Sequence, residues 1–213
     1  MIFEDWGLID YQKALDQQLK YVDQISGNED HPGFLIFCIH PAVVTTGRQT
    51  QASDVFAWQG PIIEISRGGR ATYHGPSQLV VYPILNIKKP RKNRGPQEIR
   101  GYLSDFQSAI NATLNEFGVL GISKNSDKGD DTGIWIETPE QQKKIVSVGI
   151  AVKKWVTYHG AAINVFNDPL AFAGLNPCGY KSDIMISMEK YLNQKVDLDH
   201  FKKQLKNNLD LAL

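Results

Sequence analysis

Cys178 has the sequence environment expected of a reactive cysteine. It lies in a short segment, residues 174–179, in which proline and glycine flank it and favour a loop that presents its side chain. The nucleophilic form of cysteine is the thiolate, so a reactive Cys178 requires a nearby cation or base. The candidates are Lys144, His74 and His159. The alternative is that Cys178 is a small apolar residue that fills the core.

Each candidate base has a second interpretation. Lys144 begins an apolar strand pattern at residues 144–152, where loss of solvation makes a lysine a better base, but a lysine at a strand end can also reach solvent. His74 and His159 lie in two copies of the tetrapeptide Thr-Tyr-His-Gly, at residues 72–75 and 157–160. The flanking residues differ, so no internal duplication is expected. Either histidine can equally be a hydrogen-bonded structural residue.

Residues 66–87 hold the densest cluster of glycines and polar side chains. The stretch opens with Arg67, Gly68, Gly69 and Arg70, passes through one Thr-Tyr-His-Gly copy and ends in an apolar run typical of a buried strand. Paired glycines let a ligand approach the main chain closely, and arginine and histidine supply charge and proton chemistry. We therefore expect this stretch to form one wall of a site.

Two other kinds of site fit the sequence less well. The Arg-Gly-Gly-Arg segment lacks the glycine spacing and the lysine of a phosphate-binding P-loop, and no helical pattern follows it. A metal site built from Cys178 with His40, His74 or His159 would contain no ligand pair at the close spacing of zinc motifs. We expect no metal site.

The apolar patterns predict an α+β chain, a mixed sheet with a few flanking helices. Helices are expected at residues 11–26 behind an Asp10 cap, at 97–117, and from Asp197, also a cap, to the carboxyl end. Strands are expected at 34–40, 43–46, 61–66, 133–137, 144–152 and 162–166, and at the end of the 66–87 stretch. Residues 88–94, the one strong charge run, are expected to be a solvated loop or a docking site for an acidic partner.

The composition excludes several classes of protein. The 213 residues suit a single domain, 1–213, and 42% hydrophobic with 22% charged residues is ordinary globular composition. Basic and acidic residues number 23 each, so no net charge attracts nucleic acid. No apolar run could cross a membrane and the first residues lack a signal-peptide pattern, so we expect a cytoplasmic protein with no membrane partner. A disulfide is not expected there, and Cys38 is predicted to lie in the core.

Three blocks of the sequence resemble the lipoyl(octanoyl) transferase family. They are RGGRATYHGPSQLVVYPI at residues 67–84, KIVSVGIAVKKWVTYHGAAINV at 144–165 and LNPCGY at 175–180, with GIWI at 133–136 between them. Their order and spacing match the family from about residue 43 to residue 188. The resemblance implies the fold of biotin and lipoate protein ligases, a mixed β-sheet flanked by helices. It also implies transfer of an octanoyl group from octanoyl-acyl carrier protein to a lysine of a lipoyl domain.

The same resemblance assigns roles to residues of this chain. Cys178 would carry the acyl thioester and Lys144 would tune it. The substrate-binding residues that it implies are Arg67, Gly68, Gly69, Arg70, Ala71, Thr72, Tyr73, His74, Ser147, Val148, Gly149, Gly160, Ala161 and Ala162. No cofactor is implied, because phosphopantetheine arrives on the acyl carrier protein. The implied acceptors are lipoyl domains of 2-oxoacid dehydrogenases and the glycine cleavage H protein, and a monomer is expected.

Thiol acyl transfer adds three further expectations. Backbone N–H groups near Gly75 and Cys178 are expected to hold the oxyanion. An apolar slot for the octanoyl chain is expected to be lined by Val148, Ala161, Ala162 and Tyr73. The 88–94 loop and the lysine pair at 153–154 are expected to steer acidic protein substrates.

Ser77 departs from the family's usual pattern, which has His-Gly-Pro-Gly-Gln where this chain has HGPSQ at residues 74–78. Serine would strain the turn only if that position needed a positive φ. Three alternative functions stay open at this point. They are an ATP-dependent lipoate or biotin ligase, suggested by Arg-Gly-Gly-Arg, a relative that only binds acyl carrier or lipoyl domains, and an amidotransferase that takes octanoyl from another lipoyl domain.

Overall fold

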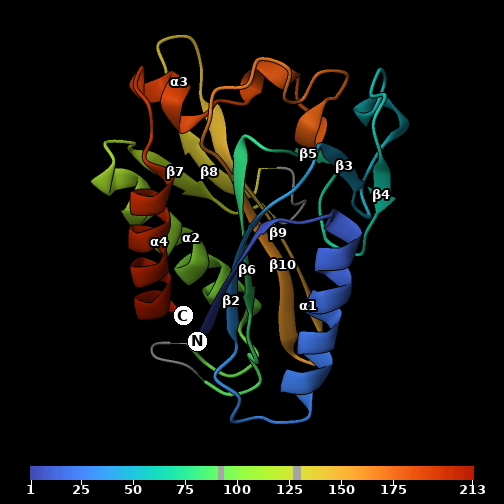
Figure 1. Ribbon diagram of the computed structural model, residues 1–213, viewed down its shortest axis with the longest axis vertical. Helices are drawn as coiled ribbons and strands as arrows, with labels where there is room; N and C mark the ends of the chain where they lie inside the picture. Colours follow the sequence, from blue (N-terminus) through green and yellow to red (C-terminus); the bar gives the residue numbers. More distant parts are fainter. Residues whose placement is uncertain (91–93, 127–130) are drawn as a thin grey trace.

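A computed structural model of the chain describes residues 1–90, 94–126 and 131–213 as two β-sheets with helices around them (Figure 1). Part of the predicted charge run, residues 91–93, lies outside the described residues. The strands are β1 Ile2–Leu8, β2 Phe34–Ile39, β3 Val43–Thr46, β4 Ile62–Glu64, β5 Thr72–His74, β6 Gln78–Ile84, β7 Gly121–Lys124, β8 Gly133–Ile136, β9 Lys143–Lys153 and β10 Val156–Asn164. The helices are α1 Tyr11–Ser26, α2 Ile99–Glu116, α3 Met188–Leu192 and α4 Leu198–Ala212, with short 3₁₀ turns η1 Ala52–Asp54, η2 Pro177–Gly179 and η3 Ser182–Ile184.

The main sheet has the strand order β1-β2-β6-β10-β9-β8-β7. β1 and β2 pair in parallel, and every other neighbouring pair in this sheet is antiparallel. A smaller sheet has the order β4-β3-β5, with β3 parallel to β4 and antiparallel to β5. The mixed α+β architecture predicted from the sequence is therefore confirmed.

Strand alternation divides the core between the two faces of the main sheet. Leu35 and Phe37 of β2 belong to a core that includes α2 and α4, whereas Phe34 and Ile36 of the same strand pack with α1. Figure 1 shows α2 and α4 on one side of the sheet and α1 on the other. Both faces of the central strands are covered, which explains the continuous apolar runs in the sequence.

Two helix starts confirm the capping predictions. The Asp10 carboxylate accepts a hydrogen bond from the Lys13 N–H at 3.1 Å, and the Asp197 carboxylate accepts one from the His200 N–H at 3.1 Å. Each bond satisfies a backbone donor that has no partner inside its helix. These caps fix where α1 and α4 begin.

Several elements differ from the sequence prediction. β1 and β7 were not predicted; they form the two edges of the main sheet and are largely exposed, so their apolar pattern is weak. β10 begins at Val156, before the predicted start at residue 162. The prediction missed the first half of the strand because that half carries polar residues, which are buried against α1 and the pocket described below. The five-residue helix α3 is too short to leave a periodic pattern.

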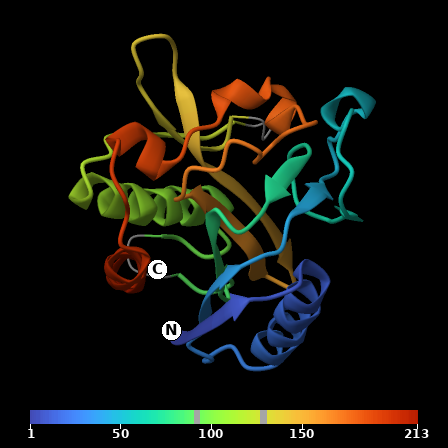
Figure 2. The same ribbon diagram turned by 45° about the horizontal axis from the view of Figure 1, so that its top comes forward.

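The segments that carry the predicted site residues meet at one end of the main sheet. The chain between β10 and α3 lies with β5 at the top of Figure 1, and Figure 2 turns this end toward the viewer. The two termini lie close to each other, and the Met1 ammonium is 3.7 Å from a carboxylate oxygen of Asp210. Within the described ranges, no helix combines the length and the apolar character needed to span a membrane.

Candidate active site

Cys178 lies in η2 with its backbone in the left-handed region, at φ 55°, which is unfavourable for a residue with a side chain. Two hydrogen bonds hold this turn: the Cys178 N–H donates to the Ala71 carbonyl at 3.0 Å, and the Gly179 N–H donates to the Asn176 carbonyl at 3.0 Å. Both cysteines are free, and Cys38 is fully buried in the core as predicted. This strained turn presents the Cys178 thiol.

Lys144 approaches Cys178 from the main sheet. Its Nζ lies 3.5 Å from the Cys178 Sγ, and the residue is only 1% exposed. The ammonium also lies over the ring of Trp135, 5.4 Å from its centroid, which favours a buried cation. Gly133 makes room for the side chain, because a Cβ on Gly133 would lie 2.8 Å from the Lys144 Cε. Lys144 is therefore a buried cation within reach of the thiol.

A β-bulge in β9 determines the face on which Lys144 lies. Ile134 of β8 pairs with Val146, but the next residue, Trp135, pairs with Lys144, so Ile145 is an extra residue. Ile145 and Val146 both contribute to the core on the side of α2. In a regular strand Lys144 would share the face of Val146 and enter that core. The bulge places it instead on the opposite face, with Trp135.

Cys178 opens into a pocket with about 490 Å³ of space free of protein atoms, open solvent at its mouth included. The residues that line it are Tyr11, Arg67, Gly68, Gly69, Arg70, Thr72, His74, Val80, Tyr82, Ser147, Val148, Gly149, His159, Gly160, Ala161, Ala162 and Cys178. Of the predicted substrate-binding residues, only Ala71 and Tyr73 do not line this pocket. The three predicted segments, which are far apart in the sequence, therefore surround one space.

The alternation of β5 explains why Tyr73 does not reach the pocket. Thr72 and His74 face the pocket, whereas Tyr73 points to the other side of the strand and packs against Phe172, with ring centroids 5.2 Å apart. The expectation that Tyr73 lines an acyl slot is therefore not met. Ala71 contributes its carbonyl group to the Cys178 turn and not its side chain to the pocket.

The two arginines bind groups of the protein itself. Arg67 donates from Nη1 to the carbonyls of Gly68 and Arg70 at 2.9 and 2.8 Å, and from Nη2 to the carbonyl and hydroxyl oxygens of Thr45 at 3.2 and 3.0 Å. Burial lowers the pKa of Arg67 below its usual range. Arg70 forms an ion pair with the fully buried Asp54. Both arginines thus fix the conformation of the glycine-rich segment.

The two Thr-Tyr-His-Gly copies meet at Tyr11. The Tyr11 ring stacks on His74 with centroids 5.4 Å apart, and its hydroxyl lies 3.5 Å from the His159 Nδ1. Burial, with a contribution from Arg67, lowers the pKa of His159 to about 3 and holds the pKa of His74 well below its usual value. In the part of the chain that the structure describes, neither histidine hydrogen-bonds Cys178, so Lys144 is the candidate base in contact with the thiol.

Ser77 is accommodated without backbone strain. It is not among the residues with positive φ, and its carbonyl accepts hydrogen bonds from the N–H groups of Val165 and Phe166 at 3.1 and 3.0 Å. A glycine is therefore not required at this position. The departure from the usual HGPGQ pattern leaves the turn intact.

Comparison with known proteins shows the family of the chain. A family model described as the lipoyl protein ligase A/B catalytic domain matches residues 10–210. The chain belongs to this family. The chain is also 52% identical to an octanoyltransferase of Bdellovibrio bacteriovorus, over an alignment that covers 98% of this chain and 97% of the relative.

Solved structures show that the chain has the fold of the lipoyl protein ligase A/B family. A putative lipoate protein ligase of Thermoplasma acidophilum with bound lipoic acid superposes with a TM-score of 0.68 at 16% identity, covering 99% of this chain and 85% of that one. The biotin protein ligase of Aquifex aeolicus superposes with a TM-score of 0.52 at 9% identity, covering 99% and 67%. The predicted fold relationship to lipoate and biotin ligases is confirmed.

Some residues of this lipoyl ligase A/B site were not found from the sequence. Tyr11, Val80 and Tyr82 line the pocket, and Asp54 and Trp135 contact its charged side chains. None of them lies within a motif whose chemistry could be read from spacing alone. Val80, Tyr82 and Trp135 lie in the 67–84 and 133–136 segments that contributed to the resemblance, but the resemblance assigned no role to them.

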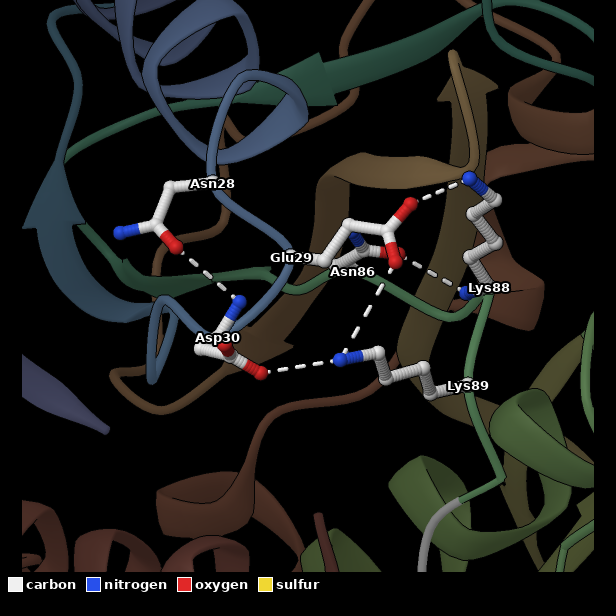
Figure 3. A network of polar contacts seen from close by, with 6 residues as sticks. All are labelled: Asn28, Glu29, Asp30, Asn86, Lys88 and Lys89. Atoms are coloured by element: carbon white, nitrogen blue, oxygen red, sulfur yellow. Dashed lines mark hydrogen bonds and ion pairs between the residues drawn. The ribbon is translucent and has the colours of Figure 1, made fainter.

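The described part of the predicted charge run is engaged in ion pairs. Lys88 bonds to Glu29, and Lys89 donates to Asp30 at 2.9 Å (Figure 3). These residues join the chain after β6 to the turn after α1, at the lower end of Figure 1. The four charges cancel, so this pair of lysines presents no net field to an acidic partner.

Lys153 and Lys154, the other cations expected to steer substrates, are paired in the same manner. Their Nζ atoms lie 3.9 and 3.1 Å from the Asp23 carboxylate of α1. The chain between β10 and α3, which carries the thiol, lies at the opposite end of the sheet in Figure 1. These four lysines of the predicted steering groups are therefore remote from the pocket and partly neutralised.

Proposed function

We propose that the protein transfers an octanoyl group from octanoyl-acyl carrier protein to the ε-amine of a lipoyl-domain lysine, through an octanoyl thioester on Cys178. The observation that carries this proposal is the 3.5 Å approach of the buried Lys144 Nζ to the Cys178 Sγ beside the pocket. The octanoyltransferase named above supports the acyl group, and the lipoyl ligase family supports the acceptor.

The first half-reaction loads the enzyme. The Cys178 thiolate, beside the Lys144 ammonium, attacks the carbonyl carbon of the donor thioester, so a carbon–sulfur bond forms and negative charge moves to the carbonyl oxygen. When this tetrahedral species collapses, the donor's carbon–sulfur bond breaks. The departing pantetheine sulfur takes a proton from Lys144, which leaves a neutral lysine beside octanoyl-Cys178.

The second half-reaction unloads the enzyme. The neutral amine of the acceptor lysine attacks the octanoyl-Cys178 carbonyl, and Lys144 takes the proton that the new amide must lose. The carbon–sulfur bond to Cys178 then breaks, which restores the thiolate and the ammonium. Conversion of a thioester to an amide is downhill, so the proposed cycle consumes no ATP and uses no cofactor besides the phosphopantetheine of the donor.

The pocket wall offered by β9 and β10 suits an acyl chain. Val148, Ala161 and Ala162 line it with small apolar side chains next to Gly149 and Gly160. Each methylene group that leaves water contributes about 0.8 kcal/mol to binding. In this proposal the length of the apolar wall sets the preferred chain length.

An ATP-dependent ligase on the same fold is the nearest rival. Such an enzyme activates the acid as an adenylate and needs no thiol, whereas this chain places a buried lysine against its cysteine. The Arg-Gly-Gly-Arg segment that suggested a ligase uses its guanidinium groups on Thr45 and Asp54. The Cys178–Lys144 contact therefore favours the transferase.

Intact-mass measurement after incubation with octanoyl-acyl carrier protein tests the proposal. The wild-type chain is expected to gain one octanoyl group, released by hydroxylamine as a thioester is. Cys178→Ser is expected to show no hydroxylamine-labile adduct, and Cys38→Ser is the matched control that retains it. Absence of the adduct in the wild type, or its persistence in Cys178→Ser, contradicts the cysteine assignment.

Donor and energy source are tested in the same assay. Replacing the donor with octanoate and ATP is expected to give neither adduct nor pyrophosphate, and pyrophosphate release would favour the ligase. Replacing acyl carrier protein with an octanoylated lipoyl domain separates the proposed enzyme from an amidotransferase. Faster loading from the lipoyl domain would identify the amidotransferase.

A further inference from the structure

The oxyanion formed in thiol acyl transfer needs hydrogen-bond donors that are already in place. The backbone N–H of the nucleophile is a common choice, and it was expected here. In this protein the Cys178 N–H already donates to the Ala71 carbonyl at 3.0 Å, and the Gly179 N–H donates to the Asn176 carbonyl at 3.0 Å. The turn that holds the thiol therefore has neither of these donors free for the substrate.

Thr72 presents an unused donor to the same pocket. The residue is 5% exposed, its Oγ1 is shielded from solvent, and that oxygen has no hydrogen-bond partner among the described residues. Thr72 lines the pocket with Cys178, and β5 alternation directs its side chain there. A buried hydroxyl without a hydrogen-bond partner lowers the stability of the folded protein, so its presence in the pocket points to a partner supplied by a ligand.

The main chain connects Thr72 to the turn that carries the reacting sulfur. The residue before Thr72 is Ala71, and its carbonyl accepts the hydrogen bond from the Cys178 N–H. The backbone of Thr72 is therefore joined directly to the residue that holds the nucleophile turn. Ser147 also has an unpartnered buried hydroxyl in the pocket wall, but it stands on β9. Among the described residues, no hydrogen bond ties Ser147 to the Cys178 turn. Thr72 is thus the hydroxyl whose position is coupled to the thiol.

We propose that the Thr72 hydroxyl donates a hydrogen bond to the oxyanion of both tetrahedral intermediates, a role that rests on the proposed octanoyl transfer. As the Cys178 sulfur bonds to the carbonyl carbon, the π electron pair moves to oxygen, and the Thr72 O–H points to that oxygen. When the pair returns, the bond to the leaving sulfur breaks and the hydroxyl keeps its proton. Thr72 is in this proposal a catalytic residue of the acyl-transfer step.

Single-turnover loading of the enzyme, followed by intact mass, tests this role with three variants. Thr72→Val keeps the shape of the side chain and removes the donor, and Thr72→Ser keeps the donor. Thr50→Val is the matched control, because Thr50 also has a buried hydroxyl without a partner but does not line the pocket. Affinity for octanoyl-acyl carrier protein and the thermal unfolding midpoint are measured for each variant.

The expected result is a loss of about 100-fold in the loading rate of Thr72→Val, with donor affinity unchanged. Thr72→Ser is expected to recover most of that rate, and Thr50→Val to match the wild type. Loading of Thr72→Val at the wild-type rate would overturn the proposal and direct attention to the N–H groups of Gly68 and Gly69. A rate loss in Thr72→Val accompanied by equally weakened donor binding would also overturn it.

Loading of the wild-type chain distinguishes a failure of the Thr72 proposal from a failure of the proposed octanoyl transfer. A wild-type chain that forms no octanoyl thioester refutes the transferase function and the Thr72 role together. A wild-type chain that loads normally beside an equally fast Thr72→Val refutes only the Thr72 role. If Thr72→Val unfolds at lower temperature, the loading rates of Thr72→Ser and the wild type still test the proposal. A donor role requires Thr72→Ser to recover most of the wild-type loading rate, and failure to do so would overturn it.

Discussion

Arg70 holds Asp54 by two charge-assisted hydrogen bonds, from Nε at 2.9 Å and from Nη2, although Asp54 is completely buried. The same guanidinium packs against the Cys178 turn, since a Cβ on Gly179 would lie 2.2 Å from the Arg70 Nη1. Gly179 has φ +83°, which is unfavourable for a residue with a side chain. A glycine at this position therefore permits both the backbone conformation and the close approach of Arg70. One ion pair therefore links η1, the glycine-rich segment and the nucleophile turn.

Loss of this arginine is expected to destabilise the fold. Arg70→Met leaves the buried Asp54 carboxylate without its cation, which should lower the free energy of unfolding by about 3 kcal/mol. Urea denaturation measures the change. The double variant Arg70→Met/Asp54→Asn should lose less, because no uncompensated charge stays buried. Equal losses in the single and double variants would contradict a coupled pair.

Lys144→Met is expected to keep the fold and lose the chemistry. Methionine fills much of the same space without a charge, so the denaturation midpoint should not fall, while octanoyl transfer should slow by at least about 100-fold. Alkylation of Cys178 by iodoacetamide near neutral pH should slow as well, because the thiolate loses its neighbouring cation. Lys143→Met, one residue away on the other face of β9, is the control and should transfer normally. Wild-type transfer by Lys144→Met would remove the lysine from the mechanism.

Acid is expected to destabilise the protein through its buried histidines. The unfolded chain binds a proton at His159 as the pH falls through about 6.5. Burial lowers the pKa of His159 to about 3 in the folded protein, and the pKa of His74 lies well below its usual value. Their contribution to stability is therefore complete above about pH 6.5 and is lost as the pH falls toward about 3.

Urea denaturation at several pH values measures that loss in the wild type and in His159→Asn. Asparagine tolerates the left-handed backbone that His159 adopts, at φ 58°, so the variant can fold. Its stability should depend less steeply on pH across this window. His200→Asn, at an exposed position, should retain the wild-type slope. Parallel slopes for the wild type and His159→Asn would contradict a neutral buried His159.

Removal of Lys88 and Lys89 is expected to leave octanoyl transfer unchanged. These lysines are half-exposed and paired with Glu29 and Asp30 at the end of the molecule away from the thiol. Exposed ion pairs of this type contribute little to stability. The apparent second-order rate constant of the Lys88→Ala/Lys89→Ala variant should match the wild type at low and at physiological salt. A fall confined to low salt would restore a steering role for this loop.

Most helices and strands of this protein were predictable from the sequence, but the contacts that complete the pocket were not. Helices with a strong apolar stripe and an aspartate cap, such as those behind Asp10 and Asp197, have a local cause and were placed correctly. The ion pair of Arg70 with Asp54 was not predicted, because an ion pair between remote segments leaves no local pattern. Tyr73 was assigned to the pocket because the bounds of β5, and hence the direction of its alternation, were not known.

The proximity of Lys144 to Cys178 could be expected from the resemblance to a known family but not from residue spacing. Counting alternate residues back from Gly149, which lines the pocket, places Ser147 on the pocket face and Lys144 on the core face. The structure reverses the second assignment by the bulge at Ile145. A bulge depends on the pairing with β8, so no window of β9 alone contains the information.

This bulge makes the pairing of β9 with β8 as important as the side chains of β9. One residue inserted in β8 between Ile134 and Trp135 would give Ile145 a partner and make β9 a regular strand, which would turn Lys144 into the packed core although every reactive residue would still be present in the sequence. An insertion in the turn between β8 and β9 would change nothing on either face. The length of that turn can therefore vary freely, whereas a residue added to β8 opposite Ile145 would remove Lys144 from the site.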